Sequence, residues 1–225
     1  MSRKAFTLAE ILITLTVIGV IAALTIPTLL QNTNQAEFKV ALKRDFADLQ
    51  QATLSIKNDA GGSLVNAFRN GTGDAKDSEN LKNAYREKLS YIKDCSGTAD
   101  NGGITNGGAS TLGCWHTSNN WKYLNGSTIP GSNTPGLILS NGTLAYFGMY
   151  KSDCSRPDGD YTVCGYIDFD VNGFKKPNTV GKDIFELALT DSGLIPTGAR
   201  GSIDPSTDCT PTGNGFSCTA KYLYE

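Results

Sequence analysis

Residues Phe6–Leu30 read FTLAEILITLTVIGVIAALTIPTLL, and this stretch decides how the chain is organised. One acidic residue, Glu10, interrupts it near its start, and the twenty residues from Ile11 to Leu30 carry no charge. Twenty such residues are enough for one membrane-spanning helix. Arg3 and Lys4 precede the stretch, and positive charge before a span keeps that end in the cytoplasm. The sequence therefore predicts that everything after Leu30 lies outside the cytoplasm.

Two ordinary explanations compete for this N-terminus, a secretory signal peptide and a plain membrane anchor. A secretory signal has a shorter apolar core followed by a small-residue cleavage site. Residues 21–23, Ile-Ala-Ala, fit such a site weakly, but the apolar run continues past them to Leu30. Glu10 argues against both explanations, because a carboxylate costs about 2.5–3.5 kcal/mol at the centre of a bilayer. We therefore expect Glu10 to have a function.

The segment KAFTLAE, residues 4–10, resembles the N-terminal signal of type IV pilins and type II secretion pseudopilins. The resemblance implies that a prepilin peptidase cuts between Ala5 and Phe6 on the cytoplasmic side and methylates the new amine. The apolar segment then stays on the mature protein, with Pro27 where the family has a helix-loosening proline. The residue before the cut is usually Gly, so Ala5 predicts slower cleavage. The match extends from Phe6 to about Ile56, a quarter of the chain.

A helical pattern resumes after Pro27 and predicts a single helix from Phe6 to Lys57. Apolar or small side chains recur at three- and four-residue steps, at Phe38, Leu42, Phe46, Leu49, Thr53 and Ile56. Charged residues are expected on the other sides, at Lys39, Lys43, Arg44, Asp45 and Asp48. Gly61-Gly62 supplies the stop signal. Residues 6–30 are thus the transmembrane and assembly part of the helix, and residues 31–57 are its amphipathic half.

The remaining residues, 58–225, are predicted to form one extracytoplasmic head of the α+β class. Asp77 or Ser78 caps an expected helix over residues 79–93. The dipeptide Asn141-Gly142 between two apolar runs predicts a hairpin. Strands are expected at residues 136–140, 143–147, 161–170, 184–189 and 219–224, with a turn at residues 192–193 leading into residues 194–195. Hairpins imply a largely antiparallel sheet, with the long helix packed on it. Pilin heads share this plan.

The six cysteines predict disulfides, because the head is expected outside the cytoplasm. Six cysteines allow fifteen pairings. They fall into three local couples in the sequence, which favours the pairs Cys95–Cys114, Cys154–Cys164 and Cys209–Cys218. No Cys-x-x-Cys pair occurs and the chain has one histidine, so a cysteine metal site is disfavoured. The net charge of −2 gives no electrostatic footprint for nucleic acid.

One segment has oxygen-bearing side chains at calcium-loop spacing. Asp168, Asp170 and Asn172 stand at alternate positions and Gly173 follows, as in the first half of an EF-hand loop. The closing Glu is missing, but Asp183 can close a site differently. The alternative is a polar turn in which Asp and Asn side chains cap their own backbone. Calcium is the one cofactor that the sequence suggests.

No enzymatic motif stands out, so we expect a non-catalytic protein. The lone His116 has no recognisable nucleophile motif beside it, and no glycine-rich phosphate loop joins a strand to a helix. The first hypothesis is a filament subunit, either a type II secretion pseudopilin or a related type IV pilin, held in the inner membrane before assembly. Its expected partners are the prepilin peptidase, other pilin-like subunits and the inner-membrane assembly platform. The alternatives are an anchored binding or adhesive protein that never polymerises and, more remotely, an anchored hydrolase using His116.

Overall fold

The structure is a computed structural model, and it describes residues 7–68, 75–95, 121–129, 134–201 and 203–225. The chain divides into two compact units, Met1–Glu37 and Phe38–Glu225. Residues 38–57 of the expected amphipathic segment therefore belong to the same compact unit as the head.

The described residues form an α+β fold, as predicted. A long helix, α1 (Leu8–Asp59), comes first, and a mostly antiparallel sheet dominates the second unit. The other elements in chain order are α2 (Leu64–Phe68), α3 (Ala75–Arg86), β1 (Tyr91–Cys95), β2 (Gly136–Leu139), β3 (Leu144–Met149), β4 (Arg156–Asp158), β5 (Tyr161–Val163), β6 (Gly165–Asp170), β7 (Ile184–Thr190), β8 (Gly193–Pro196), α4 (Pro205–Asp208) and α5 (Cys218–Tyr224).

Two features predicted from glycine positions are confirmed, the end of α1 and a hairpin turn. Gly61 and Gly62 have φ angles of 77° and 94°, and the Gly62 N–H donates to the Lys57 carbonyl at 2.8 Å, which closes α1 with a left-handed C-terminal cap. The predicted hairpin turn lies between β2 and β3. There Gly142 has φ 90°, and the Asn141 side chain accepts from the Thr143 N–H at 3.0 Å.

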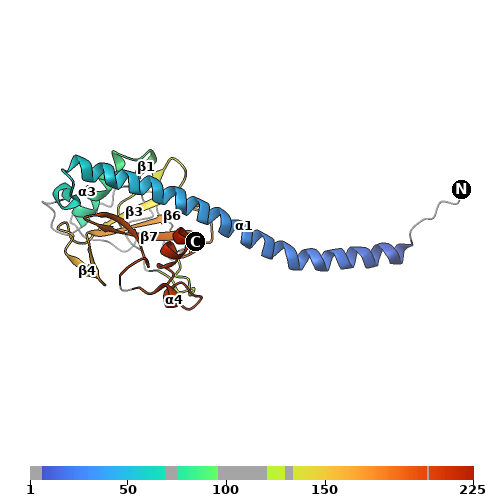
Figure 1. The fold of residues 1–225 in the computed structure, drawn as a ribbon. Coiled ribbons are helices and arrows are strands. Elements are labelled where there is room, and N and C mark those ends of the chain that lie inside the picture. The colour runs from blue at the N-terminus through green and yellow to red at the C-terminus, as the bar shows by residue number, and fades with distance from the viewer. Residues whose placement is uncertain (1–6, 69–74, 96–120, 130–133, 202) are drawn as a thin grey trace. The chain divides into compact units, whose positions relative to one another are not determined.

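The main sheet has the strand order β1-β2-β3-β6-β7-β8, and each neighbouring pair is antiparallel (Figure 1). Strands β4 and β5 form a separate two-stranded hairpin. The sequence predicted a single strand over residues 161–170. The chain instead breaks at Cys164, which is disulfide-bonded to Cys154, so residues 161–163 pair with β4 and residues 165–170 join the main sheet.

The core lies between the second half of α1 and one face of this sheet. Leu42, Leu49 and Ile56 of α1 are at most 5% exposed, and Phe147, Ile167 and Leu187 on the strands are fully buried. These α1 positions belong to the stripe that periodicity predicted. Alternation along the strands leaves Tyr146, Asp168 and Glu186 on the opposite face.

The predicted helix over residues 79–93 is wrong in its second half. Helix α3 ends at Arg86, and residues 91–95 form strand β1, which pairs with β2 at the edge of the sheet. Leu81 and Tyr85 are buried as expected, but Ile92 is 69% exposed. Tyr and Ile are residue types that favour strands, and pairing with the edge of β2 makes residues 91–95 a strand rather than a continuation of the helix.

The predicted last strand over residues 219–224 is also wrong, because Cys218–Tyr224 is helix α5. Its N–H groups bond four residues back, as in Lys221 N–H to the Ser217 carbonyl at 3.3 Å. Cys218, Thr219 and Ala220 are buried, and Tyr222 packs its ring against Phe185 at 6.3 Å between centroids. The six-residue segment alternates too briefly to separate a strand from two turns of helix.

A buried carboxylate, Asp45, joins α1 to the β2–β3 turn. The sequence placed Asp45 on the polar side of the helix, but the residue is fully buried. Its carboxylate accepts from Asn141 Nδ2 at 2.9 Å, from Thr143 Oγ1 at 2.7 Å and from Arg44 Nε at 2.9 Å. Burial raises the pKa of Asp45, and these three donors oppose the rise.

The structure contains two of the three expected disulfides, Cys154–Cys164 and Cys209–Cys218. Cys95 is also disulfide-bonded, but Cys114, its expected partner, lies outside the described residues. The pairing of Cys209 with Cys218 closes the loop that precedes α5.

Replacing Asp45 with Ala should destabilise the protein by about 1–3 kcal/mol, because the buried Thr143 Oγ1 and the Asn141 Nδ2 lose their acceptor. Asp48→Ala, one turn along the same helix at an exposed carboxylate, should change stability by no more than about 0.5 kcal/mol. Denaturant unfolding of the full chain in detergent measures both. Equal losses in the two variants would contradict the anchoring role of Asp45.

Removing the C-terminal disulfide with Cys209→Ser and Cys218→Ser should cost about 3 kcal/mol, the chain-entropy value for a loop of this length. Peptide mapping without reduction should recover Cys154 with Cys164 and Cys209 with Cys218. Recovery of a pair that joins two different couples would show that pairing of nearest cysteines is wrong.

Candidate functional site

The first candidate site is the apolar segment at the start of α1. Leu8–Pro27 has a mean hydropathy of 2.3 and is the stretch of the described residues that is long and apolar enough to cross a membrane. A signal sequence or the buried core helix of a soluble protein passes the same test. However, the large apolar side chains from Leu8 to Leu29 are 46% to 76% exposed. Such a surface needs lipid or another apolar surface around it.

Glu10 and Thr7 form a reciprocal cap at the beginning of α1. The Thr7 N–H and hydroxyl both donate to Glu10 Oε2, at 2.8 and 2.9 Å, and the Glu10 N–H donates to Thr7 Oγ1 at 3.3 Å. This is the capping box of a Thr-x-x-Glu sequence. The sequence analysis missed it, although the signal Thr7-Leu-Ala-Glu10 was present. Ala5 and Phe6, the expected cleavage position, lie outside the described residues.

The hydroxyls inside the apolar segment are satisfied within the helix. Thr14, Thr16 and Thr25 each donate to the carbonyl four residues back, at 3.0, 2.7 and 2.9 Å. Helix α1 also continues through Pro27. Glu10 is therefore the group in Leu8–Pro27 whose charge can engage something outside its own helix.

The second candidate site is the loop between β6 and β7, which brings three of the four expected calcium ligands together. Asp170 and Asp183 are fully buried. Asp170 Oδ1 accepts from the Asn172 N–H at 3.2 Å. Asp183 accepts from the N–H groups of Asn178 and Thr179, both at 2.7 Å. These bonds are the ones expected of a polar turn that caps its own backbone.

Asp168, the fourth expected ligand, faces a different group. It lies opposite Glu186 in the register of β6 and β7. Burial raises the pKa of Asp168 to about 7, and burial together with the Asp168 charge raises the pKa of Glu186 well above its usual range. Glu186 Oε1 also accepts from Thr197 Oγ1 at 2.9 Å. Asp168 therefore interacts with Glu186 on the neighbouring strand β7.

Two side-chain amide oxygens of this loop are buried and accept no hydrogen bond from the described residues. They are Asn172 Oδ1 and Asn178 Oδ1. Asn178 is 6% exposed and has a φ angle of 55°, in the left-handed region. Sequence reasoning missed Asn178, because it stands outside the alternate spacing of the loop motif. Asn and Asp tolerate the left-handed conformation better than other non-glycine residues, which is the signal that was available.

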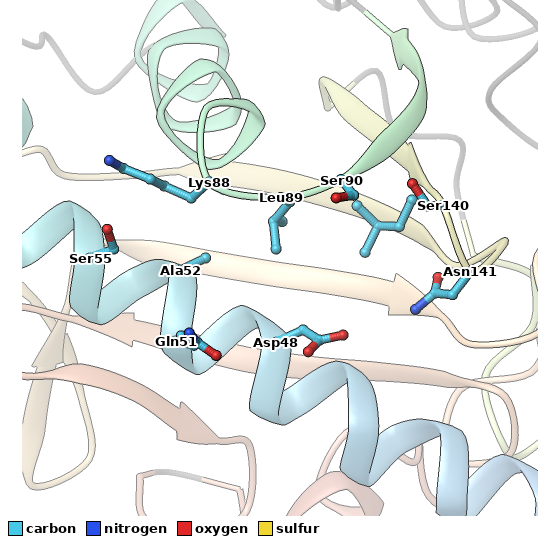
Figure 2. A pocket seen from close by; sticks show the side chains of 10 residues that line it. Asp48, Gln51, Ala52, Ser55, Lys88, Leu89, Ser90, Ser140 and Asn141 are labelled. Carbon is cyan, nitrogen blue, oxygen red and sulfur yellow. The ribbon is translucent and has the colours of Figure 1, made fainter.

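A groove on the second unit is the third candidate (Figure 2). It has a volume of about 390 Å³ and lies between α1 and two connections, α3 to β1 and β2 to β3. Asp48 and Ser55 of α1 line one side, and Ser90 and Ser140 line the other. The groove offers serine hydroxyls and one carboxylate as hydrogen-bonding groups. His116 lies outside the described residues.

Known proteins offer no guide to these three places. No protein-family model, no curated protein and no solved structure matches the chain. Any function must therefore be argued from the residues and contacts described above.

Proposed function

We propose that this chain is a pilin-like filament subunit, held in the membrane by the apolar part of α1 and polymerised through that segment after processing. The observation that carries the proposal is an exposed apolar helical segment with one carboxylate, Glu10, near its start. The protein performs no reaction in this proposal. Its work is to pack helices together and to present heads on the filament surface.

The apolar segment supports the proposal because it suits two environments. In a bilayer its backbone groups are paired within the helix, as a spanning segment requires. In a filament the same side chains pack against the segments of neighbouring subunits. Its threonine hydroxyls donate to carbonyls of the same helix, so they need no hydrogen-bond partner from the bilayer or from a neighbouring subunit.

Glu10 supports assembly rather than simple anchoring. An anchor gains nothing from a carboxylate, which is costly in the apolar part of the membrane. In the proposed processing the Phe6 amine is freed four residues before Glu10. An ammonium enclosed by apolar helices is costly unless a carboxylate pairs with it. The Glu10 carboxylate of a neighbouring subunit supplies that pair and fixes the register between subunits.

The head is consistent with this function. Residues 38–59 of α1 pack on an antiparallel sheet, which is the arrangement that the resemblance implied for a pilin head. Local disulfides stabilise its surface loops outside the cytoplasm. The proposed partners are a prepilin peptidase, further copies of this or related subunits, and an inner-membrane assembly platform.

The mature protein should begin at Phe6 and carry a methylated amine. Intact mass of the protein purified from membranes measures this directly, because loss of Met1–Ala5 and gain of one methyl group have defined masses. A chain that starts near Leu24 would instead indicate ordinary signal-peptide cleavage and would remove the filament proposal.

Two substitutions separate the charge of Glu10 from its cap. Glu10→Gln keeps a capping-box residue but loses the charge, and it should lower filament yield at least about tenfold, since about 1.4 kcal/mol is sufficient for that factor. Thr7→Ala removes the cap but keeps the charge, and should preserve most of the yield. Filaments are counted at matched membrane levels. Normal filaments from Glu10→Gln would mean that helix packing suffices.

The groove favours a second candidate, an anchored binding protein that does not polymerise. Its rim presents the Asp48 carboxylate and the hydroxyls of Ser55, Ser90 and Ser140 to a polar ligand. The processing and filament experiments distinguish the two. A wild-type protein that is processed but forms no filament under expression of the assembly machinery supports the second candidate.

A further inference from the structure

The loop between β6 and β7, residues 171–183, presents only positive charge to solvent. Its basic residues Lys175, Lys176 and Lys182 are exposed, whereas its acidic residue, Asp183, is fully buried. The three lysines make no salt bridge within the described part of the chain. The whole chain has a net charge of −2, so this loop differs in sign from the protein that carries it.

A fourth lysine is held beside the loop by backbone hydrogen bonds. The Lys122 N–H donates to the Asn178 carbonyl at 3.0 Å, and the Lys122 carbonyl accepts from the Val180 N–H at 2.9 Å. The Lys122 residue is exposed, and it also makes no salt bridge with the residues that the structure describes. Four ammonium groups therefore share one region of the surface.

Phe174 adds a large apolar side chain to this region. The residue is 50% exposed and stands directly before Lys175 and Lys176 in the chain. Lysine stems can lie along an apolar surface while their ammonium groups stay in water. Lysines beside an exposed aromatic ring are typical of protein surfaces that lie in the interface of an anionic membrane. We call Phe174 and the four lysines, 122, 175, 176 and 182, the basic loop surface.

The loop lies near the end of the second unit at which α1 enters it. Gly173 is so close to the β2–β3 turn that an added Cβ would stand 2.7 Å from the Gly142 carbonyl oxygen. The same turn holds the carboxylate of Asp45, on the part of α1 that follows soon after Phe38, the first residue of the unit. The basic loop surface is therefore at the end of the head that the chain reaches first from its apolar segment.

We propose that the basic loop surface binds the anionic lipid headgroups of the membrane that the apolar part of α1 spans. The inference rests on the membrane insertion in the proposed function. The uncharged run ends at Leu30, so about eight helical residues, roughly 12 Å of helix, connect it to the second unit. Lysines this close to a bilayer are attracted to lipid phosphates, and the Phe174 ring enters the boundary between headgroups and acyl chains.

A membrane fits this surface better than a second copy of the chain does. The apolar segment and the basic loop surface belong to one chain, so their contact with one bilayer is intramolecular and benefits from a high effective concentration. A second copy would have to offer carboxylates, and exposed ones such as Asp153 and Asp204 already accept from Ser155 and Ser206. The lipid contact orients the head on the bilayer before assembly and is released when the subunit leaves the membrane.

The test is photo-crosslinking of the full chain in vesicles of phosphatidylcholine with about one third phosphatidylglycerol. Phe174→p-benzoylphenylalanine places the crosslinker on the basic loop surface. Tyr150→p-benzoylphenylalanine is the matched control, because Tyr150 is 48% exposed and follows β3 at the end of the sheet far from the loop. Mass spectrometry should find lipid adducts at position 174 at least about fivefold more often than at position 150.

Charge reversal tests the role of the lysines. Adding Lys175→Glu and Lys176→Glu to the chain that carries the crosslinker at position 174 should lower its lipid adducts at least about fivefold. Lys93→Glu with Lys151→Glu makes the same change in net charge at exposed positions outside the loop and should leave the adducts unchanged. Vesicles of phosphatidylcholine alone should give the low value without any charge reversal, so this arm is independent of how the variants fold.

The outcomes separate this inference from the proposed function. Flotation with the vesicles reports insertion, and a chain that does not float would remove the membrane function and this inference together. A chain that floats but gives equal lipid adducts at positions 174 and 150 would overturn the lipid contact alone. Adducts that do not depend on lipid charge would overturn headgroup recognition. Adducts to peptides of a second copy, in place of lipid, would assign the basic loop surface to contacts between subunits.

Discussion

A buried carboxylate on α1 holds the helix in one position on the sheet. Asp45 lies fully buried on α1 and accepts from Asn141 and Thr143 of the β2–β3 turn. Apolar contacts alone would allow the helix to slide or rotate on the sheet, because they are non-directional. A carboxylate with fixed donors does not, because any shift leaves buried polar groups unpaired. The bond therefore fixes the register between helix and sheet, and the neighbouring β6–β7 loop packs on the same turn through Gly173.

The two parts of helix α1 differ in how their apolar side chains are distributed around the helix. Its first part carries apolar side chains all round, which is the pattern of a segment surrounded by lipid or by other apolar helices. Its second part buries one stripe, including Leu42, Leu49 and Ile56, against the sheet. The 3.6-residue period is visible only where one side meets a sheet and the other meets water. The change in pattern after Pro27 is therefore a change of environment, within one continuous helix.

Local signals in the sequence were sufficient for some features and not for others. Gly61-Gly62 and Asn141-Gly142 were predictable because left-handed backbone positions nearly specify the residue. Residues 91–95 and 218–224 were not, because a neighbouring strand or disulfide decides between helix and strand there. Asp45 was missed because its partners are 96 and 98 residues away in the chain. In the β6–β7 loop, spacing found Asp170, Asn172 and Asp183, but only folding brings Asn178 beside them and leaves Asp168 opposite Glu186.

The magnitudes of two interactions indicate when Glu10 would change its partner in the proposed filament. Its bonds to Thr7 form a helix cap, worth about 0.5–2 kcal/mol. A Phe6 amine exposed to water is already solvated, so pairing with it gains about 0–1 kcal/mol and the cap prevails. Enclosed among apolar helices, an unpaired ammonium costs several kcal/mol, which exceeds the value of the cap. The carboxylate should therefore stay on Thr7 in the free subunit and move to a neighbour's amine only when assembly excludes water, so that pairing is coupled to correct docking.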